Sequence, residues 1–378
     1  MNSERESSRR DFLRGNALVG SIANPTTSDS PGPSGYLEQY TKTAMACQFE
    51  ILLNRRQYRK GPQAVADGFE LLDLLEDQLS IYRDHSEVSQ LNRSAKSQKT
   101  PVETQLFHLL KRSAELHEST AGAFDITSSS LTKLWGFDHR SGAVPDSALI
   151  QETLRQVGSE QISLDPESET VSFSNPNVQI NLGGIGKGYA IDRMAQLFGE
   201  REVNDFIVHG GQSSVLARGN QDDFTGDQTK STPESGTTDP TAVPSEEPIK
   251  EIGWTVGLSH PTVPNCRLAE FKLLNQALGT SGTGRQGFFH QGKRYGHIID
   301  PRTGWPTDHV LSSTVISPSA ALSDALATAF FVMKLNEVED YCKAHPDVAA
   351  LLVVPSKAKG QIQLEWFNLN DDQWRRLA

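Results

Sequence analysis

A glycine-rich turn in front of an amphipathic helix constrains this chain more than any other feature. Residues 180–193 read INLGGIGKGYAIDR, with four glycines and one lysine, Lys187. Residues 171–174 and 178–180 are predicted as short strands, and apolar residues recur at helical spacing from 191 to 198, with Gly199 at the expected helix end. Free backbone N–H groups and the positive end of a helix dipole favour an anion, so the turn is a candidate phosphate site.

Two well-known phosphate-binding motifs do not fit this turn. A Walker A loop needs a glycine where Asn181 stands and a serine or threonine where Gly188 stands. A dinucleotide fingerprint beginning at Gly184 needs a third small residue where Tyr189 stands. The glycines could also serve only the close packing of a strand against a helix. The turn alone therefore leaves both interpretations open.

Two polar segments divide the 378 residues into a tail, a domain and an insertion. Residues 1–35 contain Arg9-Arg10 before a weakly apolar stretch and resemble a twin-arginine export signal with a linker, which predicts the periplasm or the outer face of the membrane. The alternative is a basic tail on a cytoplasmic protein. The domain is predicted to span 36–354. Its polar segment 219–250 has too few apolar residues to offset the conformational entropy lost on ordering, and it is predicted to be a disordered insertion. Residues 355–378 are predicted to form a C-terminal extension.

Charge and hydropathy exclude some classes of function. The net charge of −11 and the pI of about 5.4 argue against sequence-independent nucleic-acid binding. No apolar run approaches the length of about 18 residues that a transmembrane helix needs. A strand is predicted over 43–53, followed by an amphipathic helix with apolar residues from 64 to 79. Strands and helices alternate irregularly, with adjacent strand pairs, which favours an α+β fold.

Asp324 and Thr328 lie four residues apart on a predicted helix over 320–330, and therefore on one face of it. With a main-chain carbonyl they would form an oxygen-only site, which suits Mg²⁺ or Ca²⁺ and not zinc. Such a pair commonly lies on a solvated face. The neighbouring residues are nearly all apolar, however, and a buried aspartate there needs a partner or a metal ion.

A third cluster of polar residues lies in 297–304, which read HIIDPRTG. In a purely structural interpretation, the segment is a turn held by Asp300. In a functional interpretation, it brings the imidazole of His297 and the guanidinium of Arg302 near a phosphate.

Taken in order, these segments resemble the FAD:protein FMN transferases, the ApbE family of flavin transferases. The resemblance extends from about residue 43 to residue 354. The segments that carry it are residues 44–45, 80–82, 86–88, 91–92, 122–127, 134–137, 180–193, 210–211, 280–282, 297–304 and 324–328.

The resemblance implies an ApbE-like fold of mixed sheets and packed helices, with FAD in a cleft between two subdomains. The residues implied to contact FAD are Met45, Tyr82, Ala123, Phe124, Asp125, Asn181, Lys187 and His297. The implied Mg²⁺ ligands are the side chains of Asp324 and Thr328 and the main-chain oxygens of Gly184 and Ala321.

The same resemblance implies that FMN passes from FAD to a Ser or Thr hydroxyl of an acceptor redox flavoprotein, with release of AMP. Lys187 is assigned to the phosphates, and His297 or Asp300 to the hydroxyl proton or to its orientation. FAD and the acceptor flavoprotein are thus the expected partners, and the protein is expected to be a monomer or a weak dimer.

Three positions depart from the family pattern. Asn181 and Gln212 stand where aspartate is usual, and residues 283–286 read TGRQ where an acidic–aromatic pair is common. Two other functions therefore remain open. One is an FAD pyrophosphatase that yields FMN and AMP, and the other is a non-catalytic FAD-binding protein.

Overall fold

The computed structural model describes residues 37–54, 57–138, 141–221, 253–284, 287–358 and 360–377. The expected export signal and nearly all of the expected insertion lie outside these ranges. Within them, no helix combines the length and the apolar character that crossing a membrane requires.

The centre of the domain is an eight-stranded sheet in which every neighbouring pair is antiparallel. In spatial order its strands are β1 (Leu37–Ala44), β2 (Cys47–Asn54), β6 (Phe206–Gly210), β7 (Ser214–Arg218), β10 (Ala277–Gly282), β13 (Ser312–Ser317), β14 (Ala349–Pro355) and β15 (Ile362–Phe367). Most residues of β2, β7, β13 and β14 are buried, because both faces of the sheet are covered.

Three smaller sheets surround this one. β16 (Trp374–Arg376), β9 (Arg267–Leu273) and β8 (Trp254–Ser259) form one, and β3 (Thr100–Pro101), β5 (Thr170–Phe173) and β4 (Ile162–Asp165) form another. β11 (Gly287–His290) and β12 (Lys293–Gly296) form a hairpin. β8 alternates strictly between buried and exposed residues, as expected for a strand with one face on a core and one in water.

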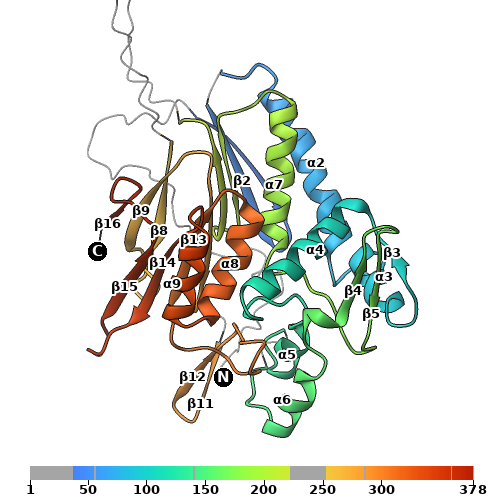
Figure 1. Cartoon of the computed structure of the whole chain (residues 1–378). Coiled ribbons are helices and arrows are strands. Elements are labelled where there is room, and N and C mark those ends of the chain that lie inside the picture. Colours follow the sequence, from blue (N-terminus) through green and yellow to red (C-terminus); the bar gives the residue numbers. More distant parts are fainter. Residues whose placement is uncertain are drawn as a thin grey trace, which may run out of the picture.

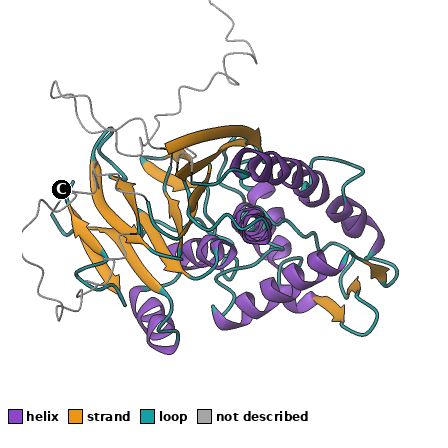
Figure 2. Cartoon of the chain, turned by 90° about the horizontal axis from the view of Figure 1, so that it is seen from above, coloured by secondary structure: helices purple, strands orange, loops and turns teal. Residues whose placement is uncertain are grey.

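The helices are α2 (Gly61–Leu79), α3 (Glu87–Ser94), α4 (Thr104–Ser119), α5 (Ser129–Leu134), α6 (Ser147–Leu154), the 3₁₀ turn η1 (Ser159–Gln161), α7 (Gly186–Glu200), α8 (Ala320–Val332) and α9 (Leu335–Ala344). Of these, α2, α7 and α8 make the main contacts with the large sheet, on the face opposite the β8–β9–β16 sheet. The main core joins the helices to one face of the large sheet, and a second core joins its other face to the small sheet. Figure 1 shows this order of layers, and from above the strands gather on one side and most of the helices on the other (Figure 2).

Two central helices position the site. α8 packs on β10, β13 and α7, and twelve of its thirteen residues are buried. α7 packs between α2 and α8 (Figure 1). A Cβ placed on Gly188 would lie 2.1 Å from the carbonyl oxygen of Ala320, so the two helices touch backbone to backbone at this glycine. The glycine-rich turn and the helix that carries Asp324 are therefore fixed against each other.

A satellite cluster joins α5 and α6 to the β11–β12 hairpin (Figure 1). The ring of Trp135 lies 5.5 Å from that of Tyr295 and 5.3 Å from that of Trp305, centroid to centroid. The indole N–H of Trp135 also donates a hydrogen bond to the carbonyl of Gly304, at 2.9 Å. The segment 297–304 is thus held between the satellite cluster and the main body.

The α+β expectation is confirmed, but several expected boundaries are wrong. Residues 43–53 belong to two strands, because Met45 and Ala46 form a two-residue turn with φ of 48° and 59°. Such turns commonly use Gly, Asn or Asp, so this one gives no sequence signal. Residues 178–180 form no strand, since Asn92 takes the place of a neighbouring strand. Its side chain pairs with both the N–H and the carbonyl of Ile180.

Two further boundaries differ at the ends of elements. α7 continues through Gly199 to Glu200, and the left-handed residue that follows is Glu202, with φ of 61°. The residues after 354 contribute β15 to the large sheet and β16 to the small one. This segment is structurally part of the domain, and its strands are short enough that periodicity alone does not reveal them.

Candidate functional site

The glycine-rich turn leads directly into α7, which starts at Gly186. Ile185 precedes the helix and forms no side-chain cap, so the side chain at this position satisfies none of the first N–H groups. One of them, the N–H of Gly188, donates to Oδ2 of Asp324 at 2.9 Å. Lys187 points its ammonium to the same carboxylate oxygen, with Nζ 3.8 Å away. The turn thus places a cation and a helix N-terminus at one point.

Asp324 is nearly buried, with 6% of its surface exposed. Burial raises the pKa of its carboxyl above the usual range, and Lys187 opposes this shift. A carboxylate in such surroundings requires compensating positive charge. Lys187 supplies part of it.

The predicted metal ligands are gathered around this carboxylate. The hydroxyl of Thr328 lies 3.2 Å from that of Ser281 on β10, and a Cβ placed on Gly184 would lie 3.9 Å from Thr328 Oγ1. Ala321 lies in the first turn of α8, where the backbone of that helix touches Gly188. Carboxylate, hydroxyl and carbonyl oxygens are the ligands that Mg²⁺ prefers, so the residues fit the metal. The described residues hold no cluster of three or more His, Cys, Asp or Glu side chains suited to a metal. A metal ion bound here would therefore need main-chain and hydroxyl oxygens in addition to the carboxylate of Asp324.

The β1–β2 turn lies beside these groups. The N–H of Met45 donates to Oε1 of Glu76 on α2, at 2.9 Å, and Glu76 also pairs with Arg83, which follows Tyr82. Burial raises the pKa of the Cys47 thiol to about 11; the nearby charge of Lys187 lowers this pKa and that of Asp324 raises it, both by less than burial does. Met45 and Tyr82 are thereby brought to the same end of α2, and 86% of the Tyr82 surface is exposed. An exposed tyrosine ring at the rim can stack on a flat ligand.

Asn181 and the 123–127 segment run side by side. The N–H of Asn181 donates to the carbonyl of Ile126 at 2.7 Å, and its side-chain oxygen accepts from the N–H of Gly183 at 2.9 Å. Ala123 and Phe124 are buried, and the ring of Phe124 packs against Gly184. Asn181, Ala123 and Phe124, which are predicted to contact FAD, therefore lie next to the glycine-rich turn.

Asp125 is the hub of a hydrogen-bond network that anchors this segment. Its carboxylate accepts bonds from the N–H and hydroxyl of Thr127, at 2.8 and 2.6 Å, and from the N–H and hydroxyl of Ser159, at 3.2 and 2.9 Å. His117 Nδ1 lies 3.1 Å from its Oδ2. Burial opposes ionisation, yet the bonds from His117 and Thr127 hold the pKa of the Asp125 carboxyl below its usual range. The bond to Asp125 raises the pKa of His117 above its usual value.

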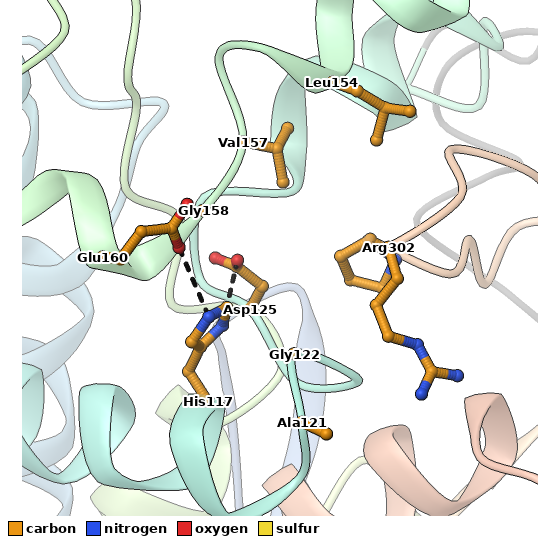
Figure 3. A pocket seen from close by; sticks show the side chains of 10 residues that line it. His117, Ala121, Gly122, Asp125, Leu154, Val157, Gly158, Glu160 and Arg302 are labelled. Carbon is orange, nitrogen blue, oxygen red and sulfur yellow. Dashed lines mark ion pairs between the residues drawn. The ribbon is translucent and has the colours of Figure 1, made fainter.

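The same network borders a pocket of about 340 Å³. Figure 3 shows His117 between Asp125 and Glu160, with Arg302 across the pocket. His117 Nε2 lies 3.4 Å from Oε2 of Glu160. Lys187 and Asp324 are not among the lining residues, so the pocket lies outside the predicted metal site.

The segment 297–304 follows β12 as a tight turn. Asp300 accepts from the backbone N–H and from Nε of Arg302, both at 2.9 Å, and from its Nη2 at 3.1 Å. Arg302 also reaches Glu337 on α9 at 3.1 Å. The carboxylate of Asp300 is thus committed to the turn, as the structural interpretation expected. His297 is partly buried at the start of the segment.

Comparison with known proteins identifies the family. The model of the ApbE family matches residues 45–352, which is most of the chain. The chain belongs to the ApbE family. A relative named FAD:protein FMN transferase from Vibrio cholerae is 30% identical over 267 residues, covering 70% of this chain and 71% of the relative. One of the same name from Treponema pallidum is 30% identical over 341 residues, covering 87% and 88%.

Solved ApbE structures share the fold. The ApbE protein of Thermotoga maritima aligns with a TM-score of 0.70 at 25% identity, over 86% of this chain and 96% of its own. The flavin transferase ApbE of Vibrio cholerae aligns with a TM-score of 0.69 at 25% identity, over 88% and 97%. The expected ApbE-like fold is confirmed by these likenesses.

The departures from the ApbE pattern fall in turns. The side-chain oxygen of Asn181 closes the glycine-rich turn through Gly183, a role that an aspartate oxygen would also fill. Gln212 is exposed in the β6–β7 turn with φ of 63°. Thr283 and Gly284 follow β10, and residues 285–286 lie outside the described ranges. Asn181 therefore makes a turn hydrogen bond that an aspartate could also accept, but without the negative charge.

The sequence analysis did not single out one carboxylate that lies beside these groups. Asp192 on α7 accepts hydrogen bonds from the start of α8, from Ser319 Oγ at 2.7 Å and from the N–H groups of Ala320 and Ala321 at 2.8 and 2.9 Å. The sequence held one signal for it. An aspartate four residues after Gly188 lies on the face of α7 that must approach another backbone.

Proposed function

We propose that the protein is a Mg²⁺-dependent FAD:protein FMN transferase that releases AMP. One observation carries this proposal: Lys187 and the N–H of Gly188 both approach the buried carboxylate of Asp324. They do so at the N-terminus of α7, directly after the glycine-rich turn. A phosphate donor and a divalent cation are the ligands that such a pairing suits. Relatives at 30% identity bear the name FAD:protein FMN transferase, which supports FAD as the phosphate donor.

The chain's own residues would divide the binding work. The N-terminus of α7 and Lys187 hold the pyrophosphate of FAD, and the carboxylate of Asp324, the hydroxyl of Thr328 and the carbonyls of Gly184 and Ala321 hold Mg²⁺. A bound Mg²⁺ supplies charge neutralisation on the pyrophosphate oxygens. Met45, Tyr82 and the 123–125 segment border the organic part of the nucleotide.

The transfer is a phosphoryl substitution at the phosphorus of the FMN half. The Ser or Thr hydroxyl oxygen of the acceptor forms a bond to that phosphorus, the bond to the bridging oxygen breaks, and AMP leaves with the bond electrons. The hydroxyl proton passes to a base. His297 suits this role better than Asp300, because the Asp300 carboxylate already accepts three bonds from Arg302.

One assay separates this function from the two alternatives. The purified protein is incubated with FAD and Mg²⁺, with and without a candidate acceptor flavoprotein, and the products are separated by chromatography and mass spectrometry. FMN bound covalently to the acceptor supports the transferase. Free FMN and AMP without acceptor indicate a pyrophosphatase, and unchanged FAD in both arms indicates a binding protein. An acceptor whose target hydroxyl is replaced by alanine is the matched control.

Export is proposed from the sequence alone. Arg9-Arg10 and the apolar stretch that follows support a twin-arginine route, which would place the enzyme with acceptors outside the cytoplasm. Replacing both arginines by lysine should retain the protein in the cytoplasmic fraction. A variant that still reaches the outer compartment would refute the route.

A further inference from the structure

Asp192 joins the helix that would bind phosphate to the helix that would bind metal. It lies in the second turn of α7, and its carboxylate spans the first turn of α8. Oδ1 accepts from the N–H of Ala320 at 2.8 Å, and Oδ2 accepts from the N–H of Ala321 at 2.9 Å and the hydroxyl of Ser319 at 2.7 Å. Three donors thus converge on one carboxylate, and two of them are backbone groups that α8 itself leaves unpaired.

A second contact, one helical turn earlier, makes this junction rigid. Gly188 touches the backbone of Ala320, and its N–H donates to Asp324. The α7 backbone thus meets α8 at Gly188 and the α7 side chain meets it at Asp192. Together they leave α8 little freedom to slide or rotate. The carbonyl of Ala321 and the carboxylate of Asp324 take their positions from this junction.

Electrostatics gives Asp192 a second effect. The N-terminus of a helix carries a partial positive charge of about half an elementary charge, which disfavours a cation nearby. The predicted metal ligands Ala321 and Asp324 belong to the first two turns of α8, so this partial charge would repel a cation bound to them. The carboxylate of Asp192 lies on the terminal N–H groups and offsets it. Arg218, whose guanidinium reaches the carbonyl of Pro318 at 3.5 Å, is the cation that faces Asp192 from β7.

We propose that Asp192 is a positioning residue for the metal site, through its bonds to Ala320 and Ala321 and its negative charge at the N-terminus of α8. The proposal rests on the proposed function, because it takes the Mg²⁺ site as given. Asp192 touches neither substrate nor metal in this view. It acts through the Ala321 carbonyl and through the local potential.

The test measures metal binding directly and needs no turnover. Mn²⁺, a paramagnetic substitute for Mg²⁺, is titrated into the metal-free full-length protein, and free Mn²⁺ is followed by electron paramagnetic resonance. Asp192→Asn keeps the size of the side chain and removes its charge. We expect its Mn²⁺ dissociation constant to rise on the order of 10-fold, as is typical for groups that orient metal ligands.

Ser319→Ala is the matched control. It removes the side-chain cap of α8 and one bond to Asp192, but leaves the charge and both backbone bonds in place. If Asp192 only caps a helix, both variants should lower the melting temperature and have the same effect on Mn²⁺ binding. We expect Ser319→Ala to bind Mn²⁺ within about twofold of wild type. Equal weakening in both variants, or unchanged affinity in Asp192→Asn, would overturn the proposal.

Two more variants complete the design. Asp324→Ala should abolish Mn²⁺ binding. If it binds like wild type, the metal site itself is wrong, and this inference falls with it. Loss in Asp324→Ala with unchanged affinity in Asp192→Asn refutes the positioning role alone. Should Asp192→Asn fail to fold, Asp192→Glu keeps the charge but moves the carboxylate by one methylene. We expect it to bind Mn²⁺ more weakly, and an unchanged affinity would refute the role of the bonds to Ala320 and Ala321.

Discussion

Because α7 and α8 are in backbone contact at Gly188, we expect Gly188→Ala to lower both the stability and the activity of the protein, although it adds only one methyl group. The added Cβ would lie 2.1 Å from the carbonyl oxygen of Ala320 and 2.4 Å from its carbonyl carbon. Neither atom can rotate away, so the helices must separate by more than 1 Å before the added Cβ reaches ordinary van der Waals contact, which begins at 3.4 Å. Overpacking of a rigid core costs about 1–3 kcal/mol, and the rigid partner places this case at the upper end.

Alanine also has a higher helix propensity than glycine, by about 1 kcal/mol, and this gain offsets part of the clash. The net loss of unfolding free energy should therefore be about 2 kcal/mol. Since 1 kcal/mol corresponds to about 2–4 °C in domains of 150–250 residues, the melting temperature should fall by about 5 °C. The displacement also moves the Gly188 N–H and Lys187 away from Asp324. A misplacement of about 1 Å at a catalytic site can cost on the order of 100-fold in rate.

Gly199→Ala is the control, because it makes the same substitution in the same helix. No atom lies within 4 Å of a Cβ placed on Gly199, so only the propensity gain applies. Its melting temperature should rise by about 2 °C, from a gain of roughly 1 kcal/mol or less. Differential scanning calorimetry and the FMN-transfer assay are run on both variants. If Gly188→Ala is as stable and active as Gly199→Ala, the backbone contact at Gly188 is not what positions the site.

Three further predictions concern charged and metal-binding groups. Asp324→Ala and Thr328→Ala should each abolish transfer and weaken Mg²⁺ binding, measured by calorimetry; full activity in both would discard the metal site. Lys187→Ala should weaken FAD binding on the order of 10-fold, as one charge-assisted contact of about 1.5 kcal/mol predicts, with the circular dichroism spectrum retained; wild-type FAD affinity would refute its phosphate role. The pKa of His117 is raised in the folded state, so its pair with Asp125 should stabilise the protein below about pH 6.5, and this contribution should fade as pH rises through the folded pKa. His117→Gln should therefore cost more stability at pH 5.5 than at pH 8.5 in urea titrations, and an equal cost at both would contradict the ion pair.

Some of this protein could be predicted from its sequence because the signals are local. The glycine-rich turn, the Asp324–Thr328 spacing and the helix over 320–330 depend on residues within one or two helical turns of each other. Their order along the chain carried the resemblance to the ApbE family, which the comparisons confirm. Elements without a local signal were missed. The Met45–Ala46 turn uses no glycine, and Asn92 replaces a strand partner from 88 residues away.

Only the tertiary structure decided what three of the aspartates do. Asp125 and Asp192 look alike in the sequence, as single aspartates among apolar residues. One anchors the 123–127 segment through Ser159, and the other holds the start of α8 from 128 residues away. Asp300 was a catalytic candidate, and its bonds to Arg302 commit it to a turn. The donors that folding places around a carboxylate determine its role, because a charge removed from water without hydrogen-bond partners costs too much free energy.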